Sequence, residues 1–280
     1  MARRRMRVGI VGAGVMAEAI IAGLVADRAV TPELLAASHP RRDRREALTE
    51  RHGIRSVSSN RDALADAEVV VVAVKPQMLS RVMRELRGRL DPDQVVVSIV
   101  AGATVRTLVD GLQHAAVVRA MPNTPSQIRR GMSVWAASEA CTGRQRDLAR
   151  GVLRALGDER QVADEGFVAM ATALSGTGPT YLFAVMEALI DACVHLGFPR
   201  ELAHDLVVET LAGSAEFAKR TEMHPAQLRN AVTSPGGTSA AASYDLEKGR
   251  IRTVFSDAVW AAYRRTLELG ERLEAEVERD

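Results

Sequence analysis

The chain has 280 residues, of which 47% are hydrophobic and 26% charged, and its formal net charge is +2. This length predicts two domains that bury their own cores, and the composition excludes a disordered, collagen-like or coiled-coil chain. The balanced charge, the 4% of aromatic residues and the lack of any long apolar run argue against nucleic-acid and membrane partners.

Two further features indicate where the protein works. Cys141 and Cys193 are too few to form a disulfide framework, which favours a reducing compartment. The basic start, Met1-Ala-Arg-Arg-Arg, is not followed by the apolar segment and small-residue cleavage site of a signal peptide. We therefore expect a cytoplasmic protein.

The first half of the chain alternates between strand and helix patterns. The apolar run Val8–Val11 ends in glycines and is followed by apolar residues at helical spacing. The strongest strand is predicted over 68–74, because a continuous β-branched run is typical of a parallel strand covered on both faces. Further strands are predicted at 34–37, 95–100, 117–121 and 131–135. This alternation predicts a parallel α/β domain over residues 1–162.

The second half contains helix patterns alone. Apolar residues recur at spacings of three and four from Leu182 to Leu196, and helices are also predicted over 202–218 and 254–277. The stretch Leu182–Leu189 of the first helix is apolar nearly all round, with Glu187 as its one charge, which predicts burial on several sides. Glu187 then either pairs across a subunit interface or lines the substrate pocket. We expect an all-α domain over 163–280 that completes its core in a homodimer or a larger dimer-based assembly.

The segment Gly12-Ala13-Gly14-Val15-Met16-Ala17 fits the pattern G-x-G-x-x-G/A between a strand and a helix. The first glycine permits the tight turn, the second lets the backbone approach a pyrophosphate, and the alanine permits close packing of helix and strand. The amino end of the helix adds free N–H groups and a favourable dipole. The pattern therefore predicts a dinucleotide site, with a purely structural turn as the alternative.

The end of the second strand indicates which dinucleotide binds. An NAD site places a carboxylate there, whereas this stretch reads Ser38-His39-Pro40-Arg41 and its first carboxylate is Asp43. A hydroxyl and a guanidinium suit the 2′-phosphate of NADPH, which a carboxylate repels. NADPH is therefore the predicted cofactor and NADH the second possibility. A solvated, arginine-rich helix over 41–51 is the alternative interpretation.

Several segments together make the chain resemble the pyrroline-5-carboxylate reductase family, from about Val8 to Leu269. The most specific is Thr233-Ser-Pro-Gly-Gly-Thr-Ser239, followed by Leu246-Glu247, which resembles the family signature. The other matching segments are, in chain order, the turn at 12–19, the strand end Ala73-Val-Lys-Pro-Gln77, the crossover Arg119-Ala-Met-Pro-Asn-Thr-Pro125, and the helix entry Thr172-Ala-Leu-Ser-Gly-Thr-Gly-Pro179.

The resemblance implies an NAD(P)H-dependent oxidoreductase that reduces a cyclic imine, most directly 1-pyrroline-5-carboxylate to L-proline. It implies a Rossmann domain with a doubly wound parallel sheet, followed by a helical dimerisation domain. The residues expected to contact the cofactor are Gly12, Ala13, Gly14, Val15, Met16, Ser38, His39, Arg41, Asn60, Ala73, Val74, Lys75, Pro76, Ala101 and Asn123.

The signature segment has a chemistry of its own. Backbone N–H groups at a helix start can converge on a carboxylate, and Ser234, Thr238 and Ser239 supply hydroxyls without adding charge. A hydroxyl beside the imine nitrogen can orient the ring and relay the proton that the nitrogen gains. We expect Ser239 in this role, with Thr238 and Ser234 as further catalytic candidates. The predicted substrate-binding set is Ser234, Gly236, Gly237, Thr238 and Ser239, and the alternative for the loop is a simple helix cap.

Other functions remain open to different degrees. Ser239 stands where the family usually has threonine, and Val15, Ala169, Thr177, Thr180 and Ser243 also depart from the usual pattern. Because of these departures together, a six-membered imine or pyrroline-2-carboxylate is an alternative substrate. A β-hydroxyacid dehydrogenase is disfavoured because it relies on a lysine in the long helix of the second domain, and Tyr181–Leu196 contains none. A serine hydrolase is disfavoured because Ala173 replaces the first glycine of the motif G-x-S-x-G around Ser175. No histidine or cysteine spacing indicates a metal site. A non-catalytic NADP-sensing protein is the alternative from a different class.

Overall fold

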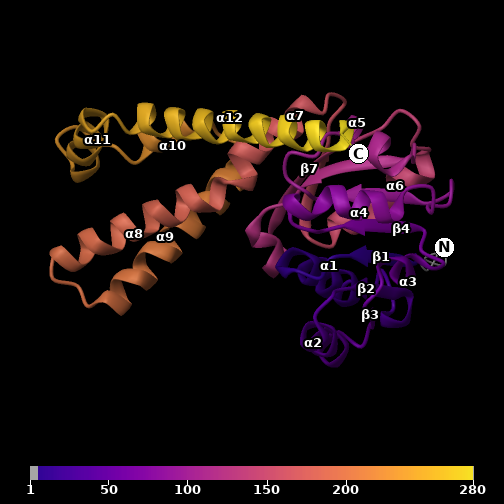
Figure 1. Ribbon diagram of the computed structural model, residues 1–280. Helices are drawn as coiled ribbons and strands as arrows, with labels where there is room; N and C mark the ends of the chain where they lie inside the picture. Colours follow the sequence, from indigo (N-terminus) through magenta and orange to yellow (C-terminus); the bar gives the residue numbers. More distant parts are fainter. Residues whose placement is uncertain (1–5, 280) are drawn as a thin grey trace. The chain divides into compact units, whose positions relative to one another are not determined.

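The computed structural model describes residues 6–279, so the basic start and the final residue lie outside the described residues. The chain forms two compact units, one made of residues up to 178 and from 261 onward and the other of residues 179–260 (Figure 1). The expected domain boundary between residues 162 and 163 stays a prediction. The compact units divide the chain later, at Gly178, and return its final segment to the first unit.

The first unit is built on one eight-stranded sheet in the order β3-β2-β1-β4-β5-β6-β7-β8. All neighbouring strands are parallel except β6 and β7, which are antiparallel. The strands are β1 (Val8–Val11), β2 (Leu35–Ser38), β3 (Arg55–Val57), β4 (Val69–Val72), β5 (Val95–Ser98), β6 (Val117–Met121), β7 (Gly131–Ala137) and β8 (Gly157–Gln161).

Helices cover both faces of this sheet because its central strands are apolar on both faces. Every residue of β1, β2, β4 and β5 is buried. One core packs the sheet against α1 (Val15–Ala26) and α6 (Gly143–Arg154). The opposite core packs it against α4 (Leu79–Leu86), α5 (Val105–Leu112) and Leu273 near the end of α12 (Ile251–Glu278). The predicted doubly wound Rossmann-type sheet is confirmed.

The two edge strands, β3 and β8, were not predicted from the sequence. β3 is the three-residue segment Arg-Ser-Val, and β8 reads Gly-Asp-Glu-Arg-Gln and is largely exposed. Short, charged strands protect the edges of a sheet from pairing with another chain. They therefore lack the apolar pattern by which the central strands were found.

The remaining helical elements of the first unit are short. They are η1 (Pro32–Leu34), α2 (Arg42–His52), α3 (Asn60–Leu64), η2 (Pro76–Met78), η3 (Thr124–Ile128), α7 (Gly166–Ala171) and a π-helical turn, η4 (Thr172–Gly176). The last 18 residues of α12 also belong here, and the Ser80 hydroxyl donates to the Glu276 carboxylate at 2.9 Å. The extra residue of a π turn is a feature found often at functional sites.

The second unit is entirely helical. Its elements are α8 (Gly178–His195), α9 (Arg200–Thr221), α10 (Pro225–Ala231), α11 (Thr238–Lys248) and the beginning of α12. The three helices predicted for this half are confirmed. All residues from 179 to 260 are described, and only Ala203 and Val207 among them are buried in the single chain. Within residues 6–279, no helix has both the length and the apolar character needed to cross a membrane.

Candidate functional site

The strand order reverses between β1 and β4, and in α/β sheets the ligand-binding crevice lies at the carboxyl ends of the strands on either side of such a reversal. Gly12 follows β1 and has a φ of 91°. A Cβ at Gly12 would lie 2.9 Å from the carbonyl oxygen of Ala73 and 2.8 Å from Cγ1 of Val74. Glycine is therefore required at this position, and three predicted cofactor residues meet at the end of these two strands.

The second glycine of the turn faces open space. No atom lies within 4 Å of the Cβ position at Gly14, which caps the amino end of α1 in an extended conformation. Ala13 is buried, whereas Val15 is 63% exposed on the first turn of the helix, next to Met16. The turn therefore leaves an accessible backbone edge at a helix amino end, which is the arrangement that binds a pyrophosphate.

The predicted 2′-phosphate residues follow β2. The hydroxyl of Ser38 is buried and donates to Oδ1 of Asn60 at 2.6 Å, so these two predicted residues are brought together. His39 accepts the backbone N–H of Arg41 at its Nδ1, and burial lowers the pKa of the imidazole. The exposed guanidinium of Arg41 pairs with Asp43 at 2.8 Å. Arg41 is thus an accessible cation at this corner, whereas the hydroxyl of Ser38 is buried and bonded within the chain.

The neighbouring strand ends carry the remaining predicted cofactor residues. Lys75 is exposed after β4, directly before Pro76 begins η2, and Ala101 lies in the turn after β5. Asn123, after β6, uses both ends of its amide within the chain. Its Nδ2 donates to the Ser175 carbonyl at 3.1 Å, and its Oδ1 accepts the Met132 N–H at 2.9 Å. Asn123 therefore joins the carboxyl end of β6 to the π turn.

A half-buried ion-pair network beside the glycine turn was not predicted from the sequence. Glu18, in the first turn of α1, accepts hydrogen bonds from Arg44, Arg51 and His52 of α2. Burial raises the pKa of this carboxyl group, but the hydrogen bonds from Arg44 and His52 outweigh that effect, and the pKa falls to about 2. An acidic residue within a predicted phosphate-binding turn was the signal that called for such partners.

In the second unit, the signature segment lies between α10 and α11. Gly237 caps α11, and a Cβ there would lie 2.5 Å from the hydroxyl oxygen of Ser234, so glycine is needed for this close approach. Thr238 and Ser239 form the first turn of α11, where backbone N–H groups have no partner within the helix. Ser234, Gly236 and Thr238 are exposed and Ser239 is half-buried. The loop therefore gathers the predicted N–H and hydroxyl donors at one helix start.

Glu247 holds the two ends of this loop region in place. Its carboxylate pairs with Arg229 of α10 at 3.4 Å and with Arg252 of α12 at 2.7 Å. The hydrogen bond from Arg252 lowers the pKa of this exposed carboxyl group. The ionised Glu247 therefore links α11 to both of its neighbouring helices.

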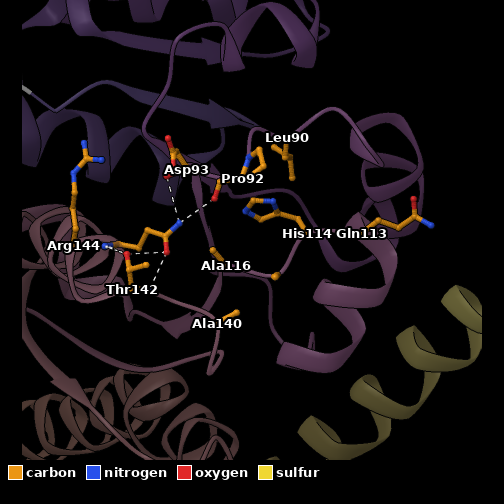
Figure 2. Close-up of a pocket in the computed structure, with 11 residues that line it drawn as sticks. Leu90, Pro92, Asp93, Gln113, His114, Ala116, Ala140, Thr142 and Arg144 are labelled. Carbon is orange, nitrogen blue, oxygen red and sulfur yellow. Dashed lines mark hydrogen bonds between the residues drawn. The ribbon is translucent and has the colours of Figure 1, made fainter.

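A separate cavity of about 350 Å³ lies next to the amino ends of β5 and β6. Figure 2 shows its lining, which comes from the segments before β5, β6 and α6 and includes Pro92, His114 and Thr142. The buried His114 donates to the Gln94 carbonyl, and burial lowers the pKa of its imidazole. The cavity lies before the amino ends of β5 and β6, whereas the glycine turn lies at the carboxyl end of β1.

Within residues 6–279, no three histidine, cysteine or acidic side chains are arranged to hold a metal ion. The glycine turn and the corner after β2 in the first unit present backbone N–H groups and an exposed arginine, and the loop before α11 in the second unit presents N–H groups and hydroxyls. Such groups bind anions and donate hydrogen bonds.

Comparisons with known proteins match the chain over nearly its whole length. Residues 165–269 match a family described as pyrroline-5-carboxylate reductase dimerisation, and residues 7–102 match one described as NADP oxidoreductase coenzyme F420-dependent. A pyrroline-5-carboxylate reductase from Synechocystis is 40% identical over 95% of this chain and 99% of its own length. The chain belongs to the pyrroline-5-carboxylate reductase family. The resemblance predicted from its motifs is thus confirmed.

Solved structures of the family have the same fold. A pyrroline-5-carboxylate reductase from Coxiella burnetii superposes with a TM-score of 0.88 at 37% identity, covering 95% of this chain and 99% of that one. A pyrroline carboxylate reductase from Plasmodium falciparum, solved with NADP bound, superposes with a TM-score of 0.86 at 27% identity, covering 95% and 98%. Both likenesses extend over the sheet unit and the helical unit.

Proposed function

We propose that this protein uses NADPH to reduce 1-pyrroline-5-carboxylate to L-proline. The observation that carries the proposal is the 40% identity to a pyrroline-5-carboxylate reductase across 95% of the chain. The two chemical elements that the reaction needs, a dinucleotide turn and a hydroxyl-rich loop, are both retained in this sequence. A non-catalytic NADP-sensing protein would have no need of the second element.

The crevice at the carboxyl ends of β1 and β4 fits a dinucleotide. The space in front of Gly14 and the amino end of α1 suit the pyrophosphate, and Arg41 suits a 2′-phosphate. When bound, the reduced nicotinamide supplies the hydride that adds to the imine carbon. The strand-end residues Ala73, Val74, Lys75, Pro76, Ala101 and Asn123 complete the proposed cofactor contacts.

The loop before α11 suits the imino acid. The backbone N–H group of Thr238, with the hydroxyl of Ser234, provides uncharged donors for the substrate carboxylate, whereas the N–H of Gly237 donates to the carbonyl oxygen of Ser234 at 3.1 Å. Ser239 is proposed to donate a hydrogen bond to the ring nitrogen and to pass a proton to it as the hydride adds to the imine carbon, and the hydroxyl regains its proton from water. A donor held in place before the reaction stabilises the charge that changes at nitrogen without reorganisation of solvent.

The test is the oxidation of NADPH with and without added imine, in the wild-type protein and in Ser239→Ala. Loss of one positioned donor is expected to lower kcat/KM by about a hundredfold. Ser239→Thr is the matched control, because it keeps the hydroxyl and is expected to stay within about threefold of wild type. A Ser239→Ala protein with full activity would remove Ser239 from the mechanism.

The same assay addresses the alternatives that the sequence left open. Five- and six-membered cyclic imines are compared by kcat/KM, and the five-membered ring is expected to be preferred. NADH and NADPH are compared at saturating imine, and NADPH is expected to be preferred. An absence of turnover with every imine, together with tight NADPH binding, would instead favour the sensing protein.

We also propose that the protein works in the cytoplasm as a homodimer or a dimer-based assembly. The match of residues 165–269 to a dimerisation family supports the assembly. The high solvent exposure of residues 179–260 in the single chain also supports it. The paucity of cysteine supports the location.

A further inference from the structure

One side chain of α2 holds the glycine turn from outside. The Nε of Arg44 donates to the carbonyl oxygen of Ala13 at 2.8 Å, and its Nη2 donates to Oε2 of Glu18 at 2.6 Å. The Arg44 side chain is 22% exposed and the Glu18 side chain 19%, so this contact is largely withdrawn from water. A single guanidinium therefore joins the turn, the first turn of α1 and α2.

The hydrogen bond to Ala13 orients the next peptide group. A trans peptide is planar, so the carbonyl of Ala13 and the N–H of Gly14 point in opposite directions. Arg44 holds the oxygen on one side, and the N–H is thereby directed to the other. The Cβ position of Gly14 is open to 4 Å, which leaves room for a ligand at this part of the backbone.

The turn needs such an anchor because of its composition. Gly12 and Gly14 lie on either side of Ala13, and glycine gives the backbone more freedom than any other residue. A flexible turn loses that freedom when it binds a ligand, which weakens binding, whereas a turn already held in place loses little. A cation on the carbonyl also polarises the peptide and strengthens its N–H as a donor.

Glu18 has a second effect that also depends on Arg44. Its carboxylate lies in the first turn of the helix whose amino end faces the proposed pyrophosphate, and an uncompensated negative charge there would repel that anion. Arg44 and Arg51 both pair with it. Because the pKa of Glu18 is lowered to about 2, these pairs persist at neutral pH.

We propose that Arg44, anchored by Glu18, is a positioning residue that orients the Ala13–Gly14 peptide for the cofactor pyrophosphate. The inference rests on the proposed function. NADH and NADPH share the pyrophosphate, so Arg44 supports the binding of both equally. Arg41 at the 2′-phosphate corner, by contrast, distinguishes between them.

The test measures the Kd of NADPH and of NADH by titration calorimetry with the full-length protein. Arg44→Met removes both hydrogen bonds and is expected to raise the two Kd values by the same factor, about tenfold. The KM for imine and the kcat at saturating NADPH are expected to change less than twofold. The matched control is Arg42→Met, which removes an exposed arginine of the same helix that pairs with Glu46. It is expected to leave both Kd values unchanged.

Two further variants keep the test decisive if Arg44→Met folds poorly. Arg44→Lys keeps the charge beside Glu18 but lacks the planar fork that reaches two acceptors, so an intermediate loss for both cofactors is expected. Glu18→Ala removes the anchor and is expected to cause a smaller loss. In combination with Arg44→Met it is expected to add none, because the two residues act as a unit.

Each contrary result has a distinct meaning. Unchanged Kd values in folded Arg44→Met or Arg44→Lys would overturn the inference. A loss confined to NADPH would also overturn it, because Arg44 would then contact the 2′-phosphate itself. If the wild-type protein bound neither dinucleotide, the proposed function would fail, and it would do so before any variant was compared.

Discussion

The two compact units of this chain bury their apolar residues very differently. In the first unit, the central strands are buried throughout and helices cover both faces of the sheet. In the second, Ala203 and Val207 alone are buried among residues 179–260, while Leu182, Phe183 and Leu196 are 55%, 56% and 80% exposed. A soluble monomer rarely leaves so many large apolar side chains in water.

The two units are therefore stabilised differently, the first by burial within the single chain and the second by burial in the proposed assembly. The sheet unit satisfies its own apolar surface, so its residues were recognisable as core positions from their sequence pattern. The helical unit carries the same kind of apolar residues but lacks a second layer in the single chain. A second copy of the chain, as proposed above, would supply that layer and turn exposed residues into core.

The largest expected effect follows from a charge placed among the exposed apolar side chains of the helical unit. Phe183→Asp is expected to convert the assembly to monomers at micromolar concentration, because a carboxylate buried at an interface costs several kcal/mol. Light scattering measures the change. Ile128→Asp is the control, since Ile128 is 73% exposed but lies in the first unit. If both variants kept the wild-type mass, the exposed apolar residues of the helical unit would not form the interface of the assembly.

A second prediction separates the two routes to stability. Ile20→Ala, in the sheet unit, leaves a cavity at a fully buried site and is expected to lower the free energy of unfolding by about 2–5 kcal/mol. Leu182→Ala is expected to act through the assembly, so its shift in melting temperature should shrink as protein concentration rises. Thermal unfolding at two protein concentrations checks this. Equal concentration dependence for both variants would contradict it.

The third prediction concerns acid stability in the sheet unit. Because the pKa of Glu18 is lowered to about 2, its pairs stabilise the fold above the ordinary carboxyl pKa, and that stability is lost as pH falls toward 2. Glu18→Gln is expected to cost about 1–3 kcal/mol at pH 7, and the difference from wild type should narrow between about pH 4.5 and 2.

Urea unfolding at several pH values measures that difference. Glu247→Gln in the helical unit is the matched control, and its effect is expected to be smaller because the Glu247 pairs are exposed. A Glu18→Gln protein that is less stable by the same amount at pH 2 and pH 7 would show that the carboxylate charge contributes nothing.

The smallest expected effect concerns the choice between NADPH and NADH in the sheet unit. Arg41→Ala is expected to lower the ratio of kcat/KM for NADPH to that for NADH by about tenfold, the loss of roughly one charge-assisted hydrogen bond. The KM for imine, which we assign to the loop of the helical unit, is expected to stay the same. An unchanged cofactor ratio would remove Arg41 from the 2′-phosphate site.

Much of the fold was predictable because its signals are local. The run Val69–Val72 identified a central strand, and Gly12 and Gly14 identified the turn, since each depends on a short stretch of backbone. The edge strand Gly157–Gln161 gave no such signal, because its residues are charged and polar rather than apolar. The split of α12 between the units was also invisible, since a continuous helix pattern carries no mark of where its packing changes.

The alternation of strands and helices, the dinucleotide turn, the hydroxyl loop at 234–239 and the family could all be predicted from the order of the amino acids. The pairing of the charged side chains became known from the folded chain. Arg41 and Arg44 are three residues apart and alike in sequence, yet one is exposed beside Asp43 and the other holds Ala13 and Glu18. A sequence pattern reports which groups are present, whereas their partners depend on contacts between residues that are distant along the chain.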